Sequence, residues 1–241
     1  MYSTIKKKKP SSFYFYLGLI GISAVLIGFF TTYITPNLNG TFKAPLIVHI
    51  HGCFAFGWII LFTIQSITIR YRNISLHKKL GYLSLLFALG IIVTLLPVGM
   101  FQVRRDFNNG MGQTAISQIV GIVTTGLMFL SLVTLGFLNR RKPKIHKRLM
   151  LLATIVILWP AWFRIRHYFP SIPRPDIWFG VVLADTLILV AWVADLVNYR
   201  KIHPALLYGG LFIITENIFE VLTFDNSTWR SFAHLIYNSL S

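Results

Sequence analysis

Seven apolar stretches, each about 20 residues long, limit what this chain can fold into. They are Phe13–Ile34, Leu46–Ile69, Leu80–Phe101, Thr114–Leu138, Leu149–Ile165, Ile177–Asn198 and Ala205–Phe224. A helix of this length and composition crosses the hydrocarbon core of a bilayer. We therefore predict an all-α, polytopic membrane bundle of seven transmembrane helices. The fifth stretch is the shortest and contains Pro160, which predicts a kink or a shallow exit.

The composition supports this class and excludes others. Hydrophobic residues make up 55% of the chain and charged residues 12%, about half the charged share of a soluble domain. The single cysteine, Cys53, excludes a disulfide scaffold. The loops are too short for a second domain. We expect a basic cytoplasmic tail at 1–12, the transmembrane domain at 13–224, and a short outer tail at 225–241.

The basic residues predict the topology. The chain has 23 Lys and Arg against 7 Asp and Glu. Cytoplasmic loops of membrane proteins collect Lys and Arg. One side of the predicted bundle holds sixteen of them: Lys6–Lys9, Arg70, Arg72, Lys78, Lys79, Arg140, Arg141, Lys142, Lys144, Lys147, Arg148, Arg200 and Lys201. This alternation places the N-terminus inside and the C-terminus outside, as an odd number of spans requires.

The same distribution indicates the surroundings of the protein. Anionic lipid headgroups are the natural partners of the basic loops. A nucleic-acid interface would need basic residues on one folded face with interleaved aromatic side chains, and here they are scattered over short loops, so we expect no nucleic acid. The predicted location is the inner (plasma) membrane of a bacterium. A partner within a larger membrane complex is also possible.

Three helix starts on the inner side share one pattern: an apolar residue, a histidine, two further residues and a leucine. The histidines are His77, His146 and His203, at the starts of the third, fifth and seventh spans. The positive end of a helix disfavours imidazolium, and a neutral imidazole can bind a metal or haem iron. We predict an inner site from these three, with Asp195 at the same depth. In the alternative, each histidine only caps its helix.

The outer half collects a second polar group. Its members are His51 in the second span, Arg164 and His167 at the end of the fifth, Asp185 in the sixth, and Glu216 and Glu220 in the seventh. Ionisable residues inside a bilayer usually pair or mark a functional path. The functional interpretation is a buried site for a metal, a quinone or protons. The structural alternative pairs Arg164 with Asp185 or Glu216 and so joins three helices.

The positions of histidine and lysine residues test whether the chain could bind haem, a catalytic metal or retinal. Two stacked haems about 20 Å apart need ligands about 13–14 residues apart on a helix, whereas His146 and His167 are 21 positions apart. A single haem b between His77 and His146 stays possible. The chain has no H-E-x-x-H motif. The seventh span has no lysine for a retinal Schiff base.

Several motifs resemble those of known membrane proteins. They are His51 with Trp58, Leu76-His77-Lys78-Lys79-Leu80-Gly81, His146-Lys147-Arg148-Leu149-Met150, and Asp195-Leu196-Val197 followed by His203-Pro204-Ala205. In this order they resemble a group of bacterial seven-helix membrane proteins with LHxxLG and HKRLM helix starts. That resemblance implies the fold and no particular reaction. The HKRLM start is also similar to one in membrane proteins of haem–copper oxidase assembly, and the LHxxLG start to haem-binding reductase membrane domains.

Three functions follow from these observations. The first is a protein that binds haem or a transition metal through His77, His146, His203, His51 and His167, with a role in redox chemistry or oxidase assembly. The second is a proton- or ion-coupled transporter of a small solute. The third is a structural subunit of a membrane complex. The sequence leaves open whether the protein is an enzyme.

Overall fold

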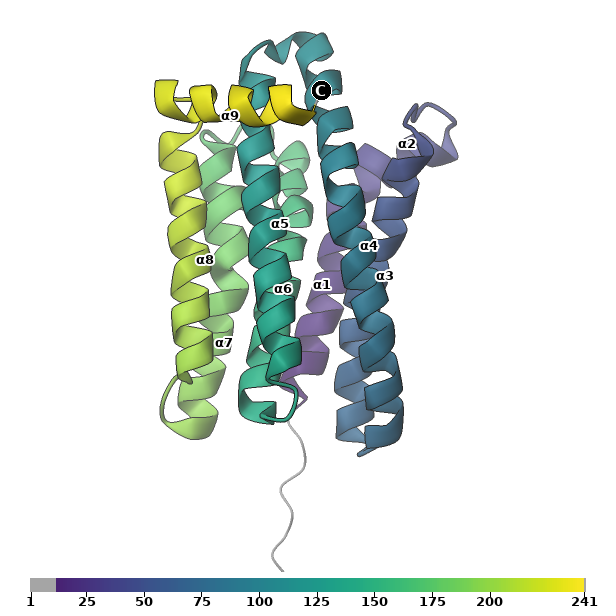
Figure 1. Ribbon diagram of the computed structural model, residues 1–241, viewed down its shortest axis with the longest axis vertical. Coiled ribbons are helices and arrows are strands. Elements are labelled where there is room, and N and C mark those ends of the chain that lie inside the picture. Colours follow the sequence, from purple (N-terminus) through teal and green to yellow (C-terminus); the bar gives the residue numbers. More distant parts are fainter. Residues whose placement is uncertain (1–11, 241) are drawn as a thin grey trace, which may run out of the picture.

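A computed structural model describes residues 12–240, and every regular element within that range is helical. Seven of its helical segments are long and apolar enough to cross a membrane, which confirms the predicted fold class. They stand side by side as a bundle, and a further helix lies across one end (Figure 1). The predicted basic segment Lys6–Lys9 lies outside the described residues.

The elements follow one another without long connections. They are α1 (Phe13–Phe29), η1 (Phe30–Ile34), α2 (Thr35–Leu38), α3 (Leu46–Arg70), α4 (Ile74–Asp106), η2 (Phe107–Met111), α5 (Thr114–Leu138), α6 (Pro143–Arg164), η3 (Ile165–Tyr168), η4 (Asp176–Leu183), α7 (Ala184–Tyr199), α8 (Pro204–Thr223) and α9 (Ser227–Leu240). The segments η1, η2 and η4 are π-helical, and η3 is a 3₁₀ turn. The predicted third and fifth spans begin too late, because α4 begins at Ile74 and α6 at Pro143, and α6 continues through Pro160.

Helix α6 is the centre of the bundle. It packs against α1, α3, α5, α7 and α8. Its residues 151–156 are all buried, whereas α3 and α8 leave much of their apolar surface to lipid. A helix that is apolar on every side belongs in the interior. The shortest of the predicted spans is therefore the one around which the others pack.

Small residues let α1 approach its neighbours closely. A Cβ atom at Gly28 would collide with the backbone carbonyl of Ala161 in α6, and one at Gly18 would collide with Thr63 in α3. Helices in a membrane commonly associate by close backbone approach at small residues. The hydrophobic effect contributes little to this association, because the lipid tails are as apolar as the helices. Helix α1 is therefore an integral part of the bundle.

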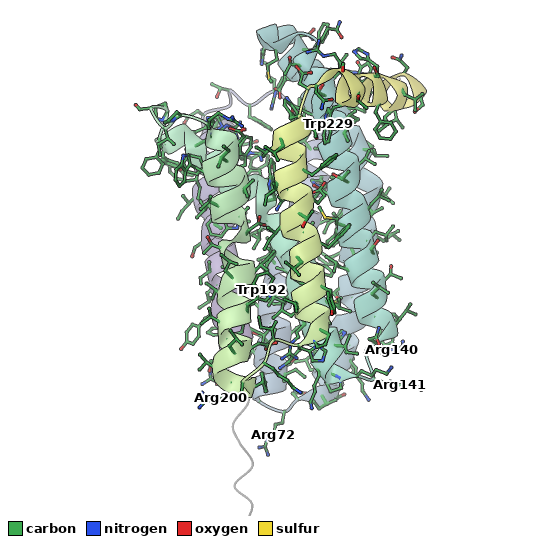
Figure 2. All side chains as sticks on the ribbon, turned by 90° about the vertical axis from the view of Figure 1, so that its left-hand side faces the viewer. Arg72, Arg140, Arg141, Trp192, Arg200 and Trp229 are labelled. Carbon is green, nitrogen blue, oxygen red and sulfur yellow. The ribbon has the colours of Figure 1, made fainter. Side chains whose placement is uncertain are left out.

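The two ends of the bundle differ in charge. Figure 2 shows Arg72, Arg140, Arg141 and Arg200 at one end, which we call the basic end. The opposite end, here the far end, carries α9 and Trp229. The loops that the sequence assigns to one side of the membrane thus lie together in space.

Helix α9 lies flat across the far end (Figure 1), in a segment that the sequence analysis treats only as a tail. Trp229 and Ala233 are buried against α5, with Ile236 and Tyr237 packed beside them. Phe232 and Leu235, beside this buried face, are exposed. Such an amphipathic helix lies in the plane of the membrane interface. Its signal in the sequence is the apolar spacing of three and four residues from Trp229 onwards.

Polar contacts hold α9 on α5. The Trp229 indole Nε1 donates a hydrogen bond to the Ser117 carbonyl at 3.0 Å. The Asp225 carboxylate accepts hydrogen bonds from Thr114 at 2.8 Å and Ser117 at 2.6 Å, and from Arg230 Nη2 at 2.6 Å. The hydrogen bond from Arg230 is the largest influence on Asp225, and together with those from Ser117 and Thr114 it lowers the pKa of that carboxyl to about 2.

This contact predicts how the docking of α9 depends on pH. A carboxyl with a depressed folded-state pKa stabilises the fold above its ordinary pKa of about 3.9, and this contribution is lost as pH falls towards the folded value. We expect the hydrogen-exchange protection of the α9 amides, corrected for intrinsic rates, to be constant near neutral pH. It should fall between about pH 4 and pH 2.

The variant Asp225→Asn is the control for this experiment. It should show weaker α9 protection at neutral pH and little further change on acidification, because it lacks the titrating carboxylate. An identical acid transition in the variant and the wild type would show that another group anchors α9.

Candidate functional site

Two of the predicted histidines meet at the basic end. His77 lies in the first turn of α4 and His146 in the first turn of α6. Their ring centres are 6.4 Å apart, and the ring planes are nearly perpendicular at 87°. Both side chains are half-buried. The structure therefore brings together the pair that the sequence nominates for a single haem.

Each ring is held by an oxygen atom on its Nδ1 side. His146 Nδ1 lies 2.8 Å from the carbonyl oxygen of Gly136 in α5, and since a carbonyl only accepts, Nδ1 carries the proton. His77 Nδ1 lies 3.4 Å from the Thr68 hydroxyl, which itself donates to the Gln65 carbonyl at 2.7 Å. The Thr68 proton is thus engaged, so His77 Nδ1 acts as the donor. In the neutral form of both rings, Nε2 keeps its lone pair.

A buried polar atom without a partner lies close to His77. Gln65 Oε1 is buried and has no hydrogen-bond partner among the described residues. The Gln65 side chain lies beside Gly81, one helical turn beyond His77 on α4. A Cβ at Gly81 would meet only Gln65 Nε2, at 3.5 Å. The absence of a side chain at Gly81 thus leaves room for the Gln65 amide on this face of α4.

His203 does not join this pair. Its Nδ1 accepts a hydrogen bond from the backbone N–H of Ala205 at 3.2 Å, so the side chain caps α8. Burial lowers the pKa of His203, which favours the neutral imidazole that this cap needs. The three helix starts therefore have different roles, and the capping alternative applies to His203.

A buried ion pair lies beside His203. Arg148 of α6 binds Asp195 of α7 through two parallel hydrogen bonds, Nε to Oδ2 at 2.8 Å and Nη2 to Oδ1 at 2.6 Å. The side chains are only 3% and 7% exposed. The backbone N–H of His203 donates to the same carboxylate at 3.1 Å. Asp195 thus joins α6, α7 and the start of α8, and the sequence analysis missed Arg148 as its partner.

The other two predicted histidines, His51 and His167, do not belong to the pair. His51 Nδ1 lies 2.8 Å from the Thr94 hydroxyl and so links α3 to α4. His167 is exposed in η3 at the far end. Within residues 12–240, no three His, Cys, Asp or Glu side chains are arranged to hold a metal ion. The histidines therefore offer one pair of ligands rather than a closed metal site.

The predicted outer polar group divides into two parts. Asp185, Glu216 and Glu220 lie within electrostatic range of one another, Asp185 with Glu216 and Glu216 with Glu220. Arg164 lies apart from them. Its guanidinium donates to the Pro160 carbonyl at 2.9 Å and stacks on the Phe29 ring at 4.3 Å. The predicted ion pair between Arg164 and Asp185 or Glu216 is absent from the described structure.

Comparison with family models, with curated proteins and with solved structures finds no match to this chain. The geometry of the side chains therefore carries the functional argument.

The Arg148–Asp195 contact generates a stability prediction. Removing one partner of a buried ion pair costs about 3–5 kcal/mol, because the other charge stays buried without compensation, while an apolar replacement of both is often neutral. We expect Asp195→Asn and Arg148→Met each to lower the thermal unfolding midpoint in detergent. The double variant Arg148→Met/Asp195→Leu should be more stable than either. A double variant at least as unstable as the sum of the two single changes would contradict this explanation.

Proposed function

We propose that this protein binds one haem b between His77 and His146 and serves in electron transfer within a membrane. The observation that carries this proposal is the 6.4 Å separation of the two ring centres. A metal–imidazole bond of about 2.0–2.1 Å puts each ring centre about 3.2 Å from the metal, so two rings on opposite sides of one ion lie about 6.4 Å apart.

The hydrogen bonds of the pair support this proposal. Histidine ligands usually donate the second ring N–H to a carbonyl or another acceptor, which fixes the tautomer and the ring orientation. His146 does so with Gly136, and His77 does so with Thr68. The lone pairs that would bind the metal are thus on Nε2 in both rings.

The number of ligands favours haem over a bare ion. A structural zinc site takes four protein ligands, and the described residues offer only this pair. Iron in a porphyrin needs only axial ligands from the protein. Bound haem supplies one-electron chemistry. In this chain, His77 and His146 would hold the iron, and Lys78, Lys79 and Arg140 at the same end would meet the propionates.

The proposal includes an orientation of the protein in the membrane. The basic end would face the cytoplasm of a bacterium, and its Arg and Lys side chains would contact anionic headgroups, in accordance with the positive-inside rule. Support comes from the grouping of Arg72, Arg140, Arg141 and Arg200 at one end (Figure 2). The haem pair would then lie near the cytoplasmic interface.

An absorption spectrum of the purified protein tests the haem proposal. We expect a Soret band and one haem per chain after expression with adequate haem supply. His77→Ala and His146→Ala should each abolish the band or weaken haem binding at least tenfold. His146→Met should keep haem and change the spectrum, because methionine is an alternative axial ligand. This variant separates loss of a ligand from loss of the fold.

His203→Asn is the matched control. It removes an imidazole from the same end of the bundle but retains a good helix cap, so the haem content should equal that of the wild type. A folded wild-type protein that binds no haem during titration would overturn the proposal. Stoichiometric metal without porphyrin would also overturn it, in favour of a bare ion.

A further inference from the structure

The chain has seven acidic residues, and their partners divide them into two groups. Four of them form ion pairs with arginine: Asp106 with Arg105, Asp176 with Arg174, Asp195 with Arg148, and Asp225 with Arg230. The other three, Asp185, Glu216 and Glu220, have no ion pair within residues 12–240 and lie within spans. An unpaired charge inside a bilayer is costly and usually functional.

The three side chains come from α7 and α8, and the two glutamates of α8 lie against α5. Asp185 is in the first turn of α7, and Glu216 and Glu220 are one turn apart on α8. Glu220 lies against Gly121 of α5, where a Cβ would collide with its carboxyl. Glu216 lies near Thr124, which is also on α5. The glycine and the small threonine of α5 thus make room for the carboxyls.

Asp185 has one carboxylate oxygen that no protein group satisfies. Its side chain is buried, with the residue 5% exposed. Oδ1 accepts a hydrogen bond from Asn217 at 2.8 Å, whereas Oδ2 has no partner in the described structure. Asp185 and Asn217 line a cavity of about 10 Å³, which is about the room that one water molecule needs. Glu216 Oε2 is a second buried oxygen without a partner.

The surroundings of Glu216 favour its neutral form. Thr124 donates its hydroxyl proton to the Gly121 carbonyl at 3.2 Å, and Glu216 has no ion pair within residues 12–240. A carboxyl in an apolar site without a cation is less costly when it is neutral.

Within the described part of the chain, no basic group pairs with this cluster. From α5 it meets Gly121, Thr124 and Thr125, and from α6 it meets Ile155 and Trp159, all uncharged. The charged residue of α6 at this end, Arg164, is bound to Pro160 and Phe29. The next charges beyond Glu220 are Asp225 and Arg230, which pair with each other.

We propose that Asp185, Glu216 and Glu220 form a buried proton-binding site in the far half of the bundle. The ligand is a proton rather than a metal ion, because the cavity has the size of one water and no three acidic, His or Cys groups in residues 12–240 are spaced to bind a metal. Like charges this close cannot all be ionised together. The site therefore holds at least one proton that it exchanges with water. This inference does not depend on haem binding.

Labelling with dicyclohexylcarbodiimide, an apolar reagent that attacks protonated carboxyl groups in apolar surroundings, tests the site. The intact protein in liposomes is treated over a range of pH, and adducts are located by mass spectrometry. We expect adducts on Asp185, Glu216 or Glu220 at neutral pH, falling at least tenfold as the pH rises. The arginine-paired Asp106, Asp176 and Asp225 are internal controls and should stay unlabelled.

Infrared spectroscopy gives a second measurement that needs no access for a reagent. The wild type should show a carboxylic acid C=O band at neutral pH that disappears at alkaline pH. The variant Asp185→Asn/Glu216→Gln/Glu220→Gln should lack this band, and amides of the same shape should preserve the fold, as unchanged circular dichroism would show. Absence of the band in the wild type at every pH would overturn the proposal. Protection from labelling by sodium ions at constant pH would also overturn it, in favour of a metal cation.

Discussion

The hydrocarbon core offers no water to polar groups, so a buried polar side chain in this bundle is costly unless it finds a partner within the protein. The Arg148–Asp195 pair shows how this requirement shapes the structure. Its two parallel hydrogen bonds and the backbone N–H of His203 satisfy a carboxylate that is almost fully buried. The contact fixes the basic ends of α6, α7 and α8 relative to one another. Since α6 packs against most of the other spans, this single pair positions the centre of the bundle.

The sequence predicts the membrane spans well, because span length and loop charge are local properties. All seven predicted segments correspond to spans of the structure, and the loops rich in Lys and Arg gather at one end (Figure 2). Helix α9 was missed because, at 14 residues, it is too short to be a membrane span. Its signal is the periodicity of residues that contact α5, and this becomes meaningful only when the bundle is known.

The site residues could be predicted only as candidates, because partner choice depends on the three-dimensional arrangement. The sequence nominated His77 and His146, but it also placed His203 with them, and the structure assigns that residue to a helix cap. The structural alternative paired Arg164 with Asp185 or Glu216, whereas the Arg164 guanidinium lies over the Phe29 ring. Asp195 pairs with Arg148, which is 47 residues away in the chain. No local pattern encodes a contact of this kind.

The two proposed sites are separated by apolar core, and this separation limits how they can communicate. On α8, Glu216 lies 13 residues beyond His203, which corresponds to about 20 Å along the helix axis. His77 and His146 lie at the same end of the bundle as His203. Between the two levels, residues 151–156 of α6 are buried and offer only Thr154 as a polar side chain. Direct proton transfer between the sites therefore has no polar path along α6, and any coupling must act through charge.

At an effective dielectric constant of about 20, two unit charges about 20 Å apart interact by about 0.8 kcal/mol. An electron at the histidine pair would thus raise the proton affinity of the carboxyl cluster by at most about fourfold, so each site would function largely independently of the other.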